Sequence, residues 1–216
     1  MRDPARTADL RASEDGRPLL ATFLLRRLRQ DPEGVYGIVA GPLDRQAIEL
    51  LVAEQQIERD RVKVYEVDGR VEDRREKQAW EVFPVPSADA PAKERWDFWT
   101  AEFSRCLRCH ACREDCPLCS CTRCITDKTR PRWIDASSTP EGNWLWNVTR
   151  AFHLGGRCVE CGNCEEACPV GIPLVALTHH LNRVAEREWG PRVTDDKVGR
   201  GPLVCFRPDD KAEFIM

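Results

Sequence analysis

The chain has 216 residues, of which 42% are hydrophobic, and its formal net charge at pH 7 is −3. This composition is typical of a globular protein, and the near balance of charge gives no basis for a nucleic-acid partner. The longest apolar run, residues 19–25, is much shorter than the roughly 20 residues that cross a membrane, so we expect no membrane span.

The start of the chain, residues 1–16, is polar and rich in helix breakers, which predicts a mobile tail. It has no apolar signal core, which makes export unexpected. The chain holds 12 cysteines with clustered spacing, and in a reducing compartment this pattern indicates metal binding rather than disulfides. We therefore expect a cytoplasmic protein.

A small α/β module is predicted over residues 17–70. Its expected elements are, in chain order, a helix over residues 18–30, a strand over 35–40, a helix over 45–56 and a strand over 62–67. Asp44 is the expected N-cap of the second helix. Two strands that flank a helix predict a parallel pair.

Residues 71–93 are charged and then proline-rich, which predicts a linker. Helix-forming residues resume at Lys93 and lead directly into Cys106. Trp96, Trp99 and Phe103 recur at helical spacing, so we expect them to face the core and to exclude water from a metal site.

Two cysteine runs with the same spacing, C-x2-C-x2-C-x3-C-P, dominate the second half of the chain. This spacing wraps a cubane iron–sulfur cluster, and the fourth cysteine of each run ligates the other cluster. The sequence therefore predicts two [4Fe–4S] clusters. The expected ligands are Cys106, Cys109, Cys112 and Cys168 for one cluster, and Cys158, Cys161, Cys164 and Cys116 for the other.

Helical patterns separate and follow the two runs, at residues 143–154 and 174–189. This order of helices and runs is typical of the α-helical ferredoxin type. We expect a dicluster ferredoxin-like domain over residues 94–216, with a short extended stretch at 201–206. The predicted fold class is α+β, with a small β-α-β module before a mostly helical dicluster domain.

Three further cysteines, Cys119, Cys121 and Cys124, follow the first run directly. Thiolates this close together can hold a third iron–sulfur cluster or a zinc ion, and the third alternative is a set of buried reduced thiols. A metal here needs a fourth ligand. The candidates are Cys205, His110, His153 and Asp127.

Two stretches carry a resemblance to a known family. They are residues 103–121, which include the first run, and residues 150–158, which lead into the second. Both look like the dicluster subunits related to the beta subunit of deazaflavin-reducing hydrogenases and formate dehydrogenases. The resemblance implies association with hydrogenase, formate dehydrogenase or heterodisulfide-reductase-like complexes.

We therefore expect a non-catalytic electron-transfer subunit that relays single electrons within a cytoplasmic oxidoreductase complex. Its expected partners are flavin- or cluster-containing redox subunits in a hetero-oligomer. The alternative is a flavin-dependent oxidoreductase subunit that acts on a deazaflavin or nicotinamide. A third reading, a zinc-binding interaction module without redox chemistry, does not explain why the chain has a second complete cysteine run.

Overall fold

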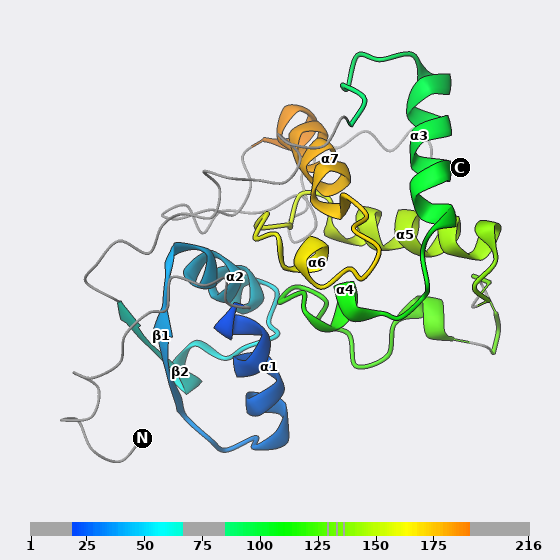
Figure 1. Ribbon diagram of the computed structural model, residues 1–216. Coiled ribbons are helices and arrows are strands. Elements are labelled where there is room, and N and C mark those ends of the chain that lie inside the picture. The colour runs from blue at the N-terminus through cyan, green and yellow to red at the C-terminus, as the bar shows by residue number, and fades with distance from the viewer. Residues whose placement is uncertain (1–18, 67–84, 129, 133, 136, 191–216) are drawn as a thin grey trace, which may run out of the picture.

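The computed structural model describes residues 19–66 and 85–190, apart from 129, 133 and 136. These residues are mostly helical, with a two-stranded parallel sheet in the N-terminal part (Figure 1). The predicted fold class, a β-α-β unit followed by a helical region, is confirmed.

The N-terminal module packs two helices against the small sheet. Its elements are α1 (Leu20–Gln30), β1 (Tyr36–Ala40), α2 (Pro42–Ala53), a short 3-10 helix (Arg59–Arg61) and β2 (Val62–Glu66). The strands pair in parallel from Tyr36 beside Val62 to Ala40 beside Glu66. The predicted elements and the parallel pairing are therefore confirmed.

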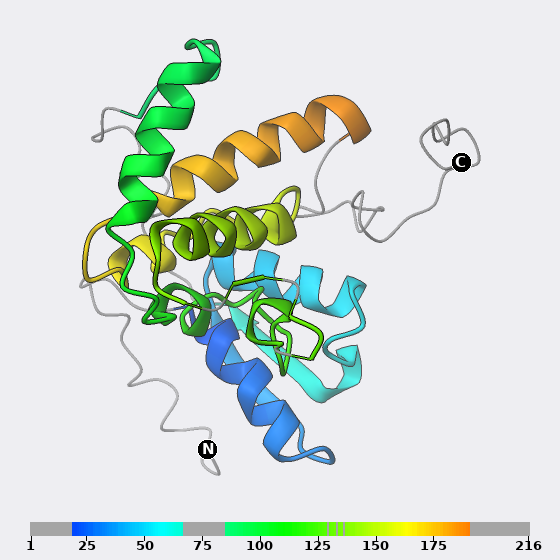
Figure 2. The ribbon, with the colours of Figure 1, turned by 90° about the vertical axis from the view of Figure 1, so that its right-hand side faces the viewer.

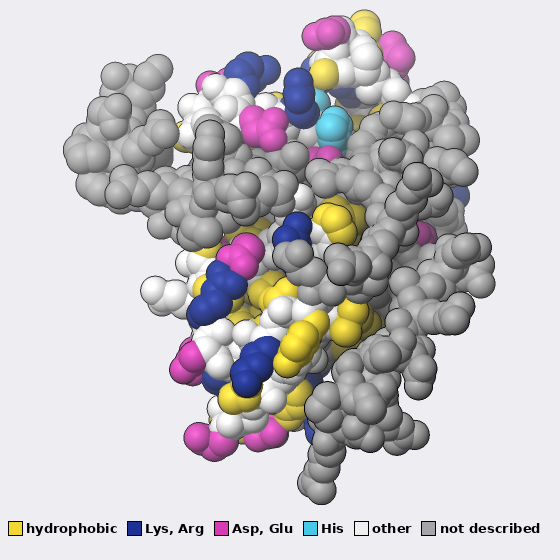
Figure 3. Space-filling view, turned by 90° about the vertical axis from the view of Figure 1, so that its left-hand side faces the viewer, with side chains coloured by type: hydrophobic (Ala, Val, Ile, Leu, Met, Phe, Trp, Pro, Cys, Tyr) yellow, Lys and Arg dark blue, Asp and Glu magenta, His cyan; other side chains and the backbone are white. Residues whose placement is uncertain are grey.

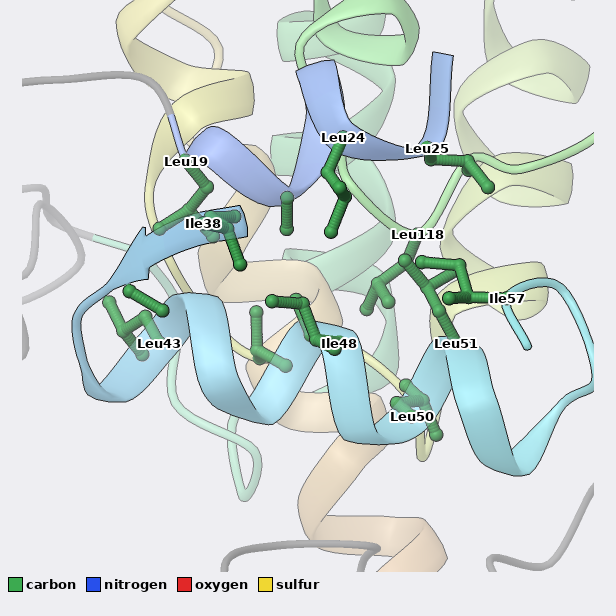
Figure 4. Packing of buried hydrophobic residues seen from close by; sticks show 14 of the residues in the cluster. Leu19, Leu24, Leu25, Ile38, Leu43, Ile48, Leu50, Leu51, Ile57 and Leu118 are labelled. Atoms are coloured by element: carbon green, nitrogen blue, oxygen red, sulfur yellow. The ribbon is translucent and has the colours of Figure 1, made fainter. Parts of the chain in front are cut away.

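The core of this module lies between α1, α2 and β1. Leu24 and Leu25 of α1 meet Ile48 and Leu51 of α2, and Ile38 comes from the strand (Figure 4). Each fully buried aliphatic side chain contributes about 1.5–3 kcal/mol. This burial holds the helices onto a sheet that is too small to be stable alone.

The predicted N-cap role of Asp44 is wrong. Helix α2 begins earlier, with Gly41 as N-cap and Pro42 at the first helical position, where proline is favoured. Asp44 is buried, and one of its carboxylate oxygens accepts a hydrogen bond from the Ala21 amide at 2.9 Å. It therefore satisfies an amide in the first turn of α1, where the helix itself provides no acceptor.

The second part of the described chain consists of helices and loops. Its helices are α3 (Ala92–Ser104), α4 (Ala111–Glu114), a 3-10 turn (Ile125–Asp127), α5 (Pro140–Leu154), α6 (Asn163–Glu166) and α7 (Leu174–Trp189). Helix α5 packs against both α3 and α7 (Figure 2). The predicted helices before, between and after the cysteine runs are confirmed.

The aromatic residues of α3 only partly follow the prediction. Phe103 is 1% exposed and stacks on Trp99 with ring centroids 5.5 Å apart. Trp96 is 56% exposed, so its predicted core position is wrong. Its ring meets that of Trp144 on α5, with centroids 5.0 Å apart, but this contact leaves more than half of Trp96 exposed.

The N-terminal module and the helical region share one core. Leu118, Leu154 and Val159 join the apolar cluster built by α1 and α2. At its edge, the Arg157 guanidinium forms a largely buried ion pair with the Glu54 carboxylate. The module is therefore packed against the segments that carry the cysteine runs.

The predicted tail (residues 1–16), the extended stretch at 201–206 and most of the predicted linker lie outside the described residues. None of the described helices is both long and apolar enough to cross a membrane. On the face in Figure 3, basic and acidic side chains are interspersed with apolar ones, in keeping with the small net charge.

Candidate metal centre

The two cysteine runs fold in the same way. In the first loop (residues 106–112), Arg108 and His110 have φ angles of 55° and 63°. In the second loop (residues 158–164), Glu160 and Gly162 stand at the corresponding positions, with φ angles of 58° and 83°. Left-handed backbone is uncommon outside glycine. Its repetition at matching positions indicates that both loops are shaped for the same ligand.

Backbone amides of these loops point at cysteine sulfurs. The Arg108 amide donates to Cys106 Sγ at 3.4 Å, and the Glu160 amide donates to Cys158 Sγ at 3.3 Å. The Ile172 amide donates to Cys168 Sγ at 3.4 Å. Hydrogen bonds of this kind stabilise thiolates and tune the potential of a cluster. The loops therefore fit thiolate ligands of an iron–sulfur cluster.

A buried asparagine fixes the start of each loop. The Asn143 side chain, on α5, donates to the Cys106 carbonyl at 2.7 Å, and that of Asn182, on α7, donates to the Cys158 carbonyl at 2.9 Å. Both asparagines are at most 2% exposed. Neither asparagine was predicted from the sequence. The sequence shows only a polar residue within an amphipathic helix, and this pattern does not identify a hydrogen-bond partner.

Replacing Asn182 with alanine should destabilise the second loop. The Asn182 amide also donates to Glu160 Oε1 at 2.6 Å and accepts from the Gly156 amide at 2.9 Å. Each buried group left without a partner costs about 1–3 kcal/mol. Thermal unfolding of the anaerobic holoprotein, followed by cluster absorbance, should therefore show a clearly lower midpoint. Arg183→Ala, at an exposed neighbour on α7, is the matched control, and equal midpoints for the two variants would contradict the assigned role.

The charge of the fourth cysteine of each run acts on a buried thiol of the other run. Burial raises the pKa of the Cys112 thiol; Arg150 opposes this, and the nearby charges of Cys106, Cys168 and Cys109 add to it. Burial likewise raises the pKa of the Cys161 thiol, and the nearby charges of Cys116, Cys158 and Cys164 add to it. Buried thiolates repel one another, and this repulsion costs free energy. Positively charged iron ions bound by the same thiolates offset that cost.

Arg150 of α5, which was not predicted from the sequence, lies close to cysteines of both runs. It is 6% exposed, and its Nη2 donates to the Cys112 carbonyl at 2.9 Å. Its Nε is buried without a hydrogen-bond partner among the described residues. Burial lowers the pKa of the guanidinium, but nearby cysteine thiolates, Cys164 and Cys116 foremost, raise it by more. A buried cation therefore stands beside cysteines of both runs.

The three additional cysteines line a cavity of about 210 Å³ together with Cys116. The Cys119 thiol lies beside the sulfur of Cys116, and their hydrogen bond lowers the pKa of Cys116 to about 6. Among the predicted fourth ligands, Asp127 lines the same cavity. His110 instead packs edge-on against Trp146, with ring centroids 4.6 Å apart.

Of the other two predicted fourth ligands, His153 is exposed on α5 and does not line the cavity, and Cys205 lies outside the described residues. No three His, Cys, Asp or Glu side chains in the described part of the chain stand close enough to hold a single metal ion. Thiolates around a cubane cluster stand farther apart than those around one zinc ion, because four irons separate them.

Residues 102–172, which include both cysteine runs, match the 4Fe-4S dicluster domain family. The prediction of two [4Fe–4S] clusters is therefore confirmed.

Three characterised proteins are similar to part of the chain. The F420-dependent formate dehydrogenase subunit beta of Methanocaldococcus jannaschii is 34% identical over 92 residues, which is 42% of this chain and 23% of that protein. The F420-dependent formate dehydrogenase 1 subunit beta of Methanococcus maripaludis is 31% identical over 100 residues, which is 45% of this chain and 25% of that protein. The succinate dehydrogenase iron-sulfur subunit of Bacillus subtilis is 31% identical over 104 residues, which is 45% of this chain and 40% of that protein. The matches thus span about a quarter of the length of the two formate dehydrogenase subunits.

Proposed function

We propose that this chain, whose residues 102–172 are a 4Fe-4S dicluster domain, is an electron-transfer subunit of a multisubunit cytoplasmic oxidoreductase. The hydrogenase, formate dehydrogenase and heterodisulfide-reductase types of complex are the proposed settings. The observation that carries the proposal is the pair of cysteine loops with left-handed backbone at matching positions, in each of which a backbone amide donates to a cysteine sulfur. The related proteins, which are subunits of oxidoreductases by name, support it.

We propose crossed ligand sets for the two clusters. Cys106, Cys109, Cys112 and Cys168 hold the first cluster, and Cys158, Cys161, Cys164 and Cys116 hold the second. The clusters supply one-electron chemistry when bound. The chain itself holds the thiolates, donates amide hydrogen bonds to sulfur, and excludes water with Phe103, Trp146 and the core of the N-terminal module.

Anaerobic purification of the chain tests the proposed function. About eight irons and eight sulfides per chain are the minimum for two clusters, and dithionite should reduce them in steps of one electron. Zinc without sulfide would overturn the proposal. The alternative function, a flavin-dependent oxidoreductase acting on a deazaflavin or nicotinamide, requires flavin in the purified chain.

The two cluster loops differ in their access to solvent. Leu107 in the first loop is 60% exposed, whereas Val159 at the matching position of the second loop is 8% exposed. Cys109 is exposed, whereas its counterpart Cys161 is 9% exposed and packs with the core of the N-terminal module. We infer that the first cluster exchanges electrons with a redox partner and that the module shields the second cluster.

Replacing Leu107 with glutamate should slow reduction of the first cluster by an anionic donor, because the new carboxylate repels the donor at the exposed loop. Stopped-flow reduction of the chain by dithionite at low ionic strength should slow roughly two- to tenfold, and salt should remove the effect. Iron content should not change. Phe152→Glu, at a 66% exposed position on α5 and outside the loop sequence, is the control. Equal rates for these two variants would contradict an exposed first cluster.

A further inference from the structure

The cavity lined by the additional cysteines has no role in the two-cluster scheme. It lies between α1 and the segment that follows the first run, and α1 contributes Thr22, Leu25, Arg26 and Arg29 to its lining. We propose that Cys119, Cys121, Cys124 and Asp127 hold a third iron–sulfur cluster in this cavity. The inference rests on the proposed function and extends it.

The segment that carries these cysteines is anchored at the residues between and beside them. Leu118 is 2% exposed in the core shared with the N-terminal module. The Arg29 guanidinium donates to the Ser120 carbonyl. Thr126, 1% exposed, donates its hydroxyl to Cys124 Sγ at 3.1 Å. The backbone is thus held by groups other than the cysteines, which line the cavity, so the site is largely preformed.

The charge around the cavity suits an anionic group. Three guanidinium groups line it, those of Arg26, Arg29 and Arg113, against the carboxylates of Glu114 and Asp127. Arg113 is ion-paired with both carboxylates, and Arg26 is paired with Glu114. A cluster held by three thiolates and a carboxylate carries net negative charge, which the surplus of cations stabilises.

The residues at the cavity can supply the ligands of a cubane cluster, because three cysteines and one aspartate line it. A cubane has four irons, so three thiolates leave one iron for a further ligand. Asp127 supplies a carboxylate at the same cavity. Cys116, a proposed ligand of the second cluster, also lines the cavity, so the third cluster extends the relay beyond the second.

Iron and acid-labile sulfide counts on the full-length chain, purified anaerobically, test this proposal. We expect about twelve irons per chain in the wild type and about eight in Cys121→Ser/Cys124→Ser. Asp127→Ala should lower the count toward that of the double variant. Cys205→Ser is the control and should retain the wild-type count. Spin quantitation of the dithionite-reduced wild type gives an independent number of clusters that does not depend on the folding of any variant.

Three results would overturn the third cluster. They are a wild-type count of about eight irons, a double variant that retains the wild-type count, and one zinc ion per wild-type chain that the double variant loses. If the anaerobically purified wild-type chain contains neither iron nor sulfide, the proposed function as a whole is rejected instead.

Discussion

Replacing Cys168 with alanine should remove the cluster whose other ligands belong to the first run. The Cys168 sulfur accepts from the Ile172 amide and lies close enough to Cys112 for its charge to raise the pKa of that thiol. Loss of one ligand commonly costs the whole cluster, so the iron content should fall by about four per chain. Anaerobic iron and sulfide analysis, with electron paramagnetic resonance of the reduced protein, measures the loss.

Paired variants decide whether the ligands are crossed between the runs. With crossed ligands, Cys109→Ala adds no further loss of iron to Cys168→Ala, because both cysteines serve one cluster. Cys161→Ala added to Cys168→Ala should instead remove both clusters. If each run holds its own cluster, the two results are exchanged. The comparison therefore gives a definite result even where each single variant also lowers stability.

The local patterns of the chain predicted its elements, because helix periodicity, strand alternation and C-x2-C spacing depend on neighbours within a few residues. The strands at Tyr36–Ala40 and Val62–Glu66 and the helix at Leu174–Trp189 lie close to their predicted positions. The positions of Asp44 and Trp96 were predicted wrongly because each depends on a distant segment. Asp44 bonds to α1, and Trp96 meets only the edge of the domain, at the ring of Trp144 on α5, where it stays 56% exposed.

The residues that position the cluster loops were not predicted either, because their roles also depend on distant segments. Asn143 and Asn182 have the helical sequence context of ordinary surface residues. Their function arises from carbonyl partners on loops 37 and 24 residues away in the chain. Nothing in the local pattern distinguishes such an asparagine from a solvated one. The positive φ of Arg108 and Glu160 is also a property of the folded loop, since neither residue type favours it.

Replacing Arg150 with methionine should lower the reduction potentials of the clusters, because Arg150 is a buried cation beside cysteines of both runs. Reduction adds an electron to a group that this cation stabilises, so its removal favours the oxidised state. At an effective dielectric constant near 20, two unit charges 4 Å apart interact by about 4 kcal/mol, and less at longer range. A loss of about 1–2 kcal/mol per cluster corresponds to roughly 40–90 mV for one electron.

Potentiometric titration followed by electron paramagnetic resonance measures this shift, and two further variants identify its cause. Arg150→Lys retains the charge and should shift the potentials less than Arg150→Met. Arg108→Met removes another buried arginine, whose guanidinium donates to the Gly142 carbonyl at 2.6 Å and lies 5.3 Å from the Trp146 ring centroid. The Arg108→Met variant should lower the stability of the protein, and it should change the reduction potentials less than Arg150→Met does. Equal shifts in Arg150→Lys and Arg150→Met would assign the effect to the lost hydrogen bond to Cys112 rather than to the charge.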